Sequence, residues 1–306
     1  MYENNIFIFD QIESKIVITD HIKDIIERAK DYIKAGYPVH FRGPSGTGKT
    51  TVAIYLAKML GKPFEIIFGS FDFNMEDLLG GQYGIKKKTV IDNYIRSVIK
   101  TEEEIEKTWI DGRILNACIN GYTLIYDEFT RTKPEINNFL LSILEEKIIE
   151  VPFKRKGGSI IKVHPDFSII FTSNPEEYVG VYKAQDALTD RMITVDLDYL
   201  DRDTEIKITM AHSDISEKDA EFIVDLIKKI REVLGTSFMP SVRYCIKIAK
   251  VLKSKNIGIG DDYNYARSIL EEILKPVNTD EKTYKYDRKM IRQIILDRLD
   301  NYYKQK

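Results

Sequence analysis

The chain has 306 residues, of which 43 % are hydrophobic and 31 % charged, and 46 Lys and Arg nearly balance 48 Asp and Glu to give a net charge of −2. This composition is typical of a globular protein with room for one large domain and a smaller one. The near balance of charge argues against a general nucleic-acid binder, which usually carries a strongly basic face.

The chain shows no feature of a membrane or secreted protein. No apolar run approaches the roughly 18 residues needed to cross a bilayer, and the N-terminus lacks the basic start and apolar core of a signal peptide. We therefore expect a cytoplasmic protein. Cys118 and Cys245 lie in helix-like apolar patterns outside any CxxC spacing, so we expect buried, reduced thiols. The four histidines form no ligand cluster by spacing, which argues against a zinc site.

Short apolar runs alternate with helical patterns over the first two thirds of the chain. The apolar spacing predicts helices at residues 20–35, 50–60, 109–120 and 134–146. The β-branched runs predict strands at residues 39–42, 64–68, 123–127, 168–172 and 192–197. Strands that alternate with helices indicate an α/β domain, with a parallel sheet covered by helices on both faces.

Two insertions interrupt this alternation, and a change of pattern marks a second domain. Residues 74–106 separate the second strand from the next helix, and residues 148–163 resemble a hairpin with its turn at residues 156–159. From about residue 200 helical periodicity dominates. We expect an N-terminal helical segment (1–36), an αβα core (37–199) and an all-helical lid domain (200–306).

A glycine-rich loop follows the first predicted strand. Residues 43–50 read GPSGTGKT and match the pattern GxxxxGK[ST] in the strand–loop–helix context that it requires. Glycines let backbone N–H groups converge on phosphate oxygens. We expect Lys49 to neutralise the β- and γ-phosphates of ATP and the Thr50 hydroxyl to bind Mg²⁺. The predicted loop residues of the nucleotide site are Gly43, Pro44, Ser45, Gly46, Thr47, Gly48, Lys49, Thr50 and Thr51.

Two adjacent acids end the predicted strand at residues 123–127. Asp127 at the strand tip can hold Mg²⁺, and Glu128 can then polarise a water molecule for attack on the γ-phosphate. Alone, an apolar run that ends in two acids is usually only strand-to-loop polarity. After a complete phosphate-binding loop, the pair predicts ATP hydrolysis rather than nucleotide binding alone.

Three further polar residues are candidates on weaker grounds. Asn174 ends the next strand, where it can orient the attacking water or simply start a turn before Pro175. Arg191 precedes the last predicted strand, and Arg243 opens a helix of the second domain. An arginine supplied by a neighbouring subunit can stabilise the transition state of phosphoryl transfer. A single arginine, however, is far more often part of a surface ion pair.

With these pieces in order, the chain resembles an AAA+ ATPase of the MoxR-like branch, and within it the gas vesicle protein GvpN family. The Tyr-Asp-Glu-Phe-Thr-Arg string from Tyr126 and the Thr-Ser-Asn-Pro-Glu-Glu-Tyr string from Thr172 are the most specific. The strings that carry the resemblance are HFRGP at 40–44, VIDNYI at 90–95, LIYDEFTR at 124–131, NNFLLSILEE at 137–146, VHPDF at 163–167, IFTSNPEEY at 170–178 and QDAL at 185–188.

The resemblance implies a five-stranded parallel αβα domain followed by a helical lid, with residues 74–106 as an insert that faces the pore of a ring. It also implies that Asn174 is the sensor-1 residue, Arg191 the arginine finger and Arg243 the sensor-2 arginine. Relatives differ in whether the last of these acts on its own nucleotide or on a neighbour's. The implied cofactors are ATP and Mg²⁺, and the implied assembly is a homo-oligomer, usually hexameric.

The implied function is remodelling of gas vesicle shell or accessory proteins during vesicle assembly and growth, in the cytoplasm beside the vesicles. One alternative is a MoxR-type chaperone ATPase that activates, or inserts metal into, another enzyme. Another is a nucleotide-gated scaffold with negligible turnover, against which the Asp127–Glu128 pair argues. The near-neutral charge and the absence of DNA-binding motifs argue against nucleic acid as a partner, and no membrane partner is expected.

Overall fold

The protein is described from a computed structural model, which covers residues 16–93, 98–151, 160–174, 182, 186–235, 238–276 and 281–304, with backbone alone for residues 82–108 and 282. The chain forms two compact units. One holds Ile25–Gly43 and Val52–Asp196, and the other holds Pro44–Thr51, the chain from Leu197 onward and a short N-terminal stretch.

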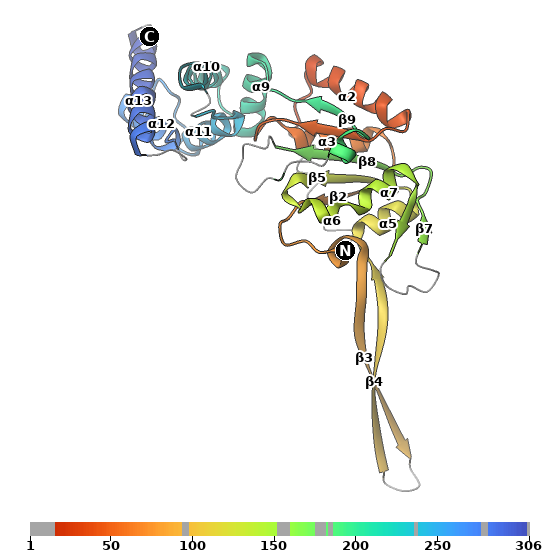
Figure 1. Cartoon of the computed structure of the whole chain (residues 1–306). Helices are drawn as coiled ribbons and strands as arrows, with labels where there is room; N and C mark the ends of the chain where they lie inside the picture. Colours follow the sequence, from red (N-terminus) through yellow and green to blue (C-terminus); the bar gives the residue numbers. More distant parts are fainter. Residues whose placement is uncertain are drawn as a thin grey trace. The chain divides into compact units, whose positions relative to one another are not determined.

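The first unit is built on a five-stranded sheet with the order β2-β5-β8-β1-β9 (Figure 1). Every neighbouring pair runs parallel, which confirms the predicted α/β class. The strands are β1 (Val39–Arg42), β2 (Phe64–Phe68), β5 (Thr123–Asp127), β8 (Ser168–Ser173) and β9 (Ile193–Asp196). Three of these match the predicted bounds; β8 is one residue longer than predicted at its end, and β9 is one residue shorter at both ends.

Burial of the central strands explains why they read as short apolar runs in the sequence. All five residues of β5 are buried, as expected for a parallel strand covered on both faces. The largest fully buried side chains include Tyr126, Phe129 and Phe171, and the last two rings meet edge to face with centroids 5.1 Å apart. Such aromatic contacts add about 0.5–1.5 kcal/mol each beyond the burial itself.

Helices lie before and between these strands, and two predicted helices need correction. The helix predicted at 109–120 begins only at Arg113, because residues 109–111 extend a strand that pairs with Gly80–Gln82. The helix predicted at 134–146 is divided at Asn138. The helices are α2 (Asp20–Lys34), α3 (Lys49–Met59), α4 (Met75–Leu79), α5 (Arg113–Asn120), α6 (Pro134–Asn137), α7 (Phe139–Glu145) and α8 (Asp186–Thr189), with a 3-10 turn η1 (Phe129–Arg131).

The larger insertion is a long β-hairpin. Strand β3 (Gly80–Asn93) pairs antiparallel with β4 (Val98–Asp111) over fourteen residues each, and the hairpin extends away from the sheet of its unit (Figure 1). At about 3.4 Å per residue each strand is roughly 45 Å long. The sequence located this insertion but did not predict its structure.

Gly80 and Gly112 lie at the base of the hairpin. Gly80 has φ 105°, and a Cβ there would lie 2.2 Å from the carbonyl oxygen of Ile110. A Cβ on Gly112 would lie 2.5 Å from the carbonyl oxygen of Leu78. Any larger residue at either position would therefore push the two chain segments apart.

The smaller insertion contains the predicted hairpin. Strand β6 (Ile148–Glu150) pairs antiparallel with β7 (Ile160–Lys162). The turn predicted at residues 156–159 lies outside the described residues.

The second unit is helical from α9 onward, as predicted. Its helices are α9 (Arg202–Ser213), α10 (Glu217–Leu234), α11 (Val242–Ser254), α12 (Tyr263–Ile273) and α13 (Glu281–Lys304). The side chains of Asp201, Ser216 and Asp262 cap three of them by accepting backbone N–H groups, each worth about 1 kcal/mol. The described part of the chain contains no helix long and apolar enough to span a membrane.

Both cysteines are free and buried, as predicted. Burial raises the pKa of the Cys245 thiol to about 12, and it likewise raises that of Cys118. Both groups therefore remain protonated thiols at neutral pH.

Candidate nucleotide site

The phosphate-binding loop joins β1 to α3. Gly46 and Gly48 both have φ 86°, in the left-handed region that glycine adopts without a Cβ penalty. Lys49 is 7 % exposed, and its Nζ donates a hydrogen bond of 2.7 Å to the Pro44 carbonyl oxygen. The Thr47 hydroxyl donates to the same oxygen at 3.0 Å. The lysine ammonium is thus folded back over the loop. The loop leads into the N-terminal end of α3, and a helix N-terminus is suited to an anion.

The start of α11 lies against this loop. Arg243 Nη1 donates to Ser45 Oγ at 3.2 Å. A Cβ on Gly46 would lie 2.3 Å from Ser241 Oγ, so this glycine is required by packing as well as by its φ angle. The structure therefore brings the predicted sensor-2 arginine to the phosphate-binding loop of its own chain.

A second group of polar residues gathers at the carboxyl ends of β5 and β8. Asp127 is 5 % exposed, and the Thr172 hydroxyl donates to its Oδ1 at 2.5 Å. The same hydroxyl accepts the Glu128 backbone N–H at 2.9 Å. One threonine therefore fixes both members of the acidic pair.

Thr172 was not among the residues predicted from the sequence. A signal was available, because Thr172 is a hydroxyl residue that directly follows the apolar run 169–171 and lies two residues before Asn174. Residues two apart on a strand share one face of the sheet.

Glu128 adopts a strained backbone that aims its side chain. Its φ of 51° and ψ of 43° place it in the left-handed region, which costs a residue with a Cβ roughly 1–2 kcal/mol. Its carboxylate accepts Asn174 Nδ2 on Oε1 at 3.3 Å and pairs with Arg131 Nε on Oε2 at 2.6 Å. The structure thus brings together the predicted base and the predicted sensor-1 amide.

Close packing behind Glu128 holds this backbone. The Gly69 N–H donates to the Asp127 carbonyl oxygen at 2.7 Å, and a Cβ on Gly69 would lie 2.2 Å from the Glu128 carbonyl oxygen. The Tyr126 hydroxyl lies 2.9 Å from Thr132 Oγ1 and 3.0 Å from Asn137 Oδ1. Burial raises the pKa of this phenol to about 12, so that it remains a hydrogen-bond donor.

A buried histidine on β1 connects the two neighbouring strands, β8 and β9, through its side chain. His40 Nε2 lies 2.8 Å from Ser173 Oγ on β8, and Nδ1 lies 3.1 Å from Thr194 Oγ1 on β9. Burial, with a smaller contribution from Arg42, lowers the pKa of the imidazole to about 4. The ring is therefore neutral at physiological pH.

Arg191 is held elsewhere on the sheet unit. Its Nη2 donates to Glu145 Oε2 at 2.7 Å and its Nη1 to the Ala187 carbonyl oxygen at 2.6 Å. The Glu145 partner is 59 % exposed. Within the residues that the structure describes, Arg191 is therefore not one of the groups that surround Glu128.

The donor types of both groups fit the predicted ligands. Mg²⁺ prefers oxygen ligands such as the Thr50 hydroxyl and the Asp127 carboxylate. Phosphate groups suit the turn with positive-φ glycines, together with Lys49 and Arg243.

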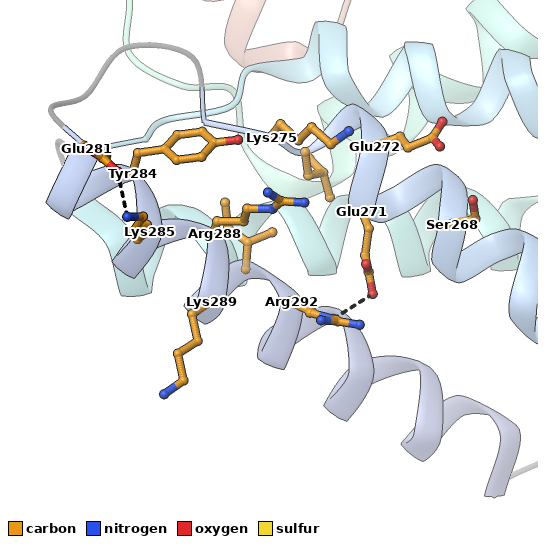
Figure 2. A pocket seen from close by; sticks show the side chains of 12 residues that line it. Ser268, Glu271, Glu272, Lys275, Glu281, Tyr284, Lys285, Arg288, Lys289 and Arg292 are labelled. Atoms are coloured by element: carbon orange, nitrogen blue, oxygen red, sulfur yellow. Dashed lines mark hydrogen bonds and ion pairs between the residues drawn. The ribbon is translucent and has the colours of Figure 1, made fainter.

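The helical unit contains a separate pocket of about 660 Å³, lined by residues of α12 and α13 and the segment that joins them (Figure 2). Glu271 pairs there with Arg292 at 3.3 Å and Glu281 with Lys285 at 2.6 Å. Its lining includes none of the predicted nucleotide-binding residues.

A parallel sheet with this strand order, a GxxxxGKT loop after β1 and an Asp–Glu pair at the end of β5 defines a P-loop protein of the AAA class. In agreement, the AAA domain family (dynein-related subfamily) matches residues 38–192. Among solved structures, NtrX from Brucella abortus in complex with ADP has the same fold, with a TM-score of 0.55 at 17 % identity over 95 % of this chain and 66 % of that chain.

Sequence relatives narrow the class. The gas vesicle ATPase GvpN of Ancylobacter aquaticus is 42 % identical over 249 residues, which cover 81 % of this chain and 70 % of the relative. The gas vesicle ATPase GvpN of Haloferax mediterranei is 36 % identical over 85 % of this chain and 73 % of the relative. The chain belongs to the GvpN family, which confirms the resemblance inferred from the sequence.

Proposed function

We propose that this chain is an ATP-hydrolysing AAA+ protein that remodels gas vesicle shell or accessory proteins during vesicle assembly and growth. The observation that carries the ATPase assignment is the Glu128 carboxylate, held between Asn174 and Arg131 directly after the buried Asp127. The GvpN relatives, which are gas vesicle ATPases, support the link to gas vesicles.

In this proposal the two polar groups act on one ATP molecule. The phosphate-binding loop from Gly43 to Thr51 holds the phosphates, with Lys49 and Arg243 balancing their charge. Mg²⁺ bound by Thr50 and Asp127 would withdraw charge from the γ-phosphate. Glu128 accepts a proton from the attacking water while Asn174 keeps that carboxylate in position.

We further propose that the active site is completed in a homo-oligomeric ring. Arg191 is paired with an exposed glutamate, and such pairs contribute only about 0–1 kcal/mol. It can therefore exchange Glu145 for the nucleotide of a neighbouring subunit at small cost. In this proposal, with a domain boundary at about residue 200, the finger belongs to the αβα core and Arg243 to the helical lid.

The β3–β4 hairpin is proposed to face the ring pore. A two-stranded hairpin is marginally stable by itself in water, so a neighbour or a client that covers it would stabilise it. Contact with a client at this position would connect ATP hydrolysis to remodelling.

The enzymatic part is tested with Glu128→Gln, which should bind ATP but release no phosphate because the amide cannot accept a proton. Arg191→Ala should also lose turnover, and mixing it with Lys49→Ala subunits should restore part of it, because the latter donate an intact finger. Turnover of Glu128→Gln at the parent rate would contradict the role of Glu128 as catalytic base. Failure of the mixture to recover activity would contradict a site shared between subunits.

The cellular part is tested in cells that carry a gas vesicle gene cluster. Gas-filled shells scatter light and collapse under a pressure step, so the signal lost on collapse reports their volume. Deletion of the chain and Glu128→Gln should both lower this signal. An unchanged signal in both cultures would favour the MoxR-type role on another enzyme instead.

A further inference from the structure

A buried ion pair joins the first two helices of the helical unit. Arg231 on α10 pairs with Glu205 on α9 through two parallel contacts, Nη2 to Oε1 at 2.8 Å and Nη1 to Oε2 at 3.1 Å. The two side chains are only 10 % and 3 % exposed. A buried pair of this kind is weak grounds for a purely stabilising role, because desolvation offsets most of the attraction.

The same arginine reaches the segment that precedes α11. Its Nε donates to the Pro240 carbonyl oxygen at 2.6 Å, and its guanidinium carbon lies 4.6 Å from the centre of the Tyr199 ring. The Tyr199 hydroxyl donates to the Met239 carbonyl oxygen at 3.3 Å. Two successive carbonyl groups of the segment before α11 therefore accept hydrogen bonds from side chains outside that segment.

These carbonyl groups directly precede the residues that touch the phosphate-binding loop. Ser241 lies against Gly46, and Arg243 donates to Ser45. Proline at position 240 restricts φ and limits independent rotation of this short segment. We therefore expect that a displacement of Pro240 also moves Arg243, which lies three residues further along the chain.

We infer that Arg231, oriented by Glu205, is a positioning residue for nucleotide binding: it fixes residues 239–243 and thereby places Arg243 on the phosphate-binding loop. This inference rests on the proposed ATPase function. It predicts that the pair affects ATP affinity only through Arg243.

The test replaces both members of the pair. Removing Arg231 alone would leave a buried carboxylate without its partner and could unfold the unit. Glu205→Met with Arg231→Met keeps apolar packing of similar volume but removes the hydrogen bond to Pro240. A second variant, Arg231→Lys, retains the charge opposite Glu205 but not the planar fork that serves both partners.

A matched control lies on the same two helices. Arg202 on α9 pairs with Asp225 on α10 at 2.7 Å and 3.0 Å, and no interaction with α11 is among its described contacts. Arg202→Met with Asp225→Met therefore removes an ion pair between α9 and α10 without removing a contact to the segment before α11.

ATP affinity is measured by calorimetric titration with Mg²⁺ present and with Glu128→Gln in every variant to prevent turnover. The Glu205–Arg231 variants should bind ATP about tenfold more weakly, since a hydrogen bond from a charged donor has that order of effect, and the control should match the parent. In an Arg243→Met background the same changes should have no further effect, because the affected contact is already missing.

Unchanged affinity in folded Glu205–Arg231 variants, or losses that add to that of Arg243→Met, would overturn the positioning role. Thermal unfolding of each variant verifies that it is folded. If Lys49→Ala and Arg243→Met both bind ATP like the parent, the proposed nucleotide site itself fails, which is a distinguishable result.

Discussion

Acidification should destabilise the sheet unit through His40. This side chain is 3 % exposed and lies between β8 and β9, and burial lowers the pKa of its imidazole from 6.5 to about 4. The unfolded chain therefore binds a proton between pH 6.5 and 4 that the folded chain does not. Stability from this group is fully present above pH 6.5 and is lost as the pH falls toward 4.

The magnitude follows from the two pKa values. The full difference corresponds to about 3 kcal/mol, of which about 2 kcal/mol is already lost at pH 5. The assay is urea unfolding at pH 7.5 and pH 5 for the parent and for His40→Asn. The variant should start less stable at pH 7.5, because two hydrogen bonds are disturbed, but its stability should fall less between the two pH values.

The parent and His40→Asn share the carboxylates that also titrate in acid. The difference between their losses of stability from pH 7.5 to pH 5 therefore reports the contribution of His40. His21→Gln, which replaces an exposed histidine on α2, provides the control for the loss of an imidazole. If parent and His40→Asn lose the same stability between pH 7.5 and 5, the buried neutral imidazole does not control the acid sensitivity and the reasoning is refuted.

Two further substitutions test contacts at the candidate site and at the hairpin. Thr172→Val keeps the shape of the side chain but removes the hydrogen bond that Thr172 donates to Asp127, so the free energy of unfolding should fall by about 1–3 kcal/mol and phosphate release should fall. Equal melting temperatures for this variant and the parent would contradict the role of the shared hydroxyl. Gly112→Ala should displace the base of the hairpin and speed proteolysis of β3 and β4. Gly81→Ala should not, because the nearest atom to a Cβ at that position lies 3.4 Å away. Equal rates of digestion for the two variants would contradict the requirement for glycine at position 112.

Local patterns predicted much of the fold. The strands at residues 39–42, 64–68 and 123–127 are short runs rich in apolar and β-branched residues, and the first and last of them lead directly into residues of the two candidate groups. The GPSGTGKT motif located the phosphate-binding loop because its function depends on glycines and on a following helix. Each of these features is contained in a short stretch of consecutive residues.

What the sequence did not predict depends on contacts between distant residues. The β3–β4 hairpin has strands that follow no simple alternation, and its register is set by pairing of Gly80 with Asp111, more than thirty positions apart. Trp109 was placed in a helix because its neighbours fit an apolar helical pattern, but pairing with Gln82 overrides that local preference. Thr172 gains its importance only from β8 lying beside β5.

The geometry of Glu128 explains why an adjacent Asp–Glu pair can divide two tasks. On a continuous strand neighbouring side chains point to opposite faces, which would separate the two carboxylates. The left-handed backbone at Glu128 ends β5 and turns its carboxylate toward Asn174, while Asp127 remains buried on the strand. Glycine would adopt this backbone without strain but has no carboxylate. The strain at Glu128 is offset by the hydrogen bond to Thr172 and the pair with Arg131, and Gly69 leaves the space that this turn requires.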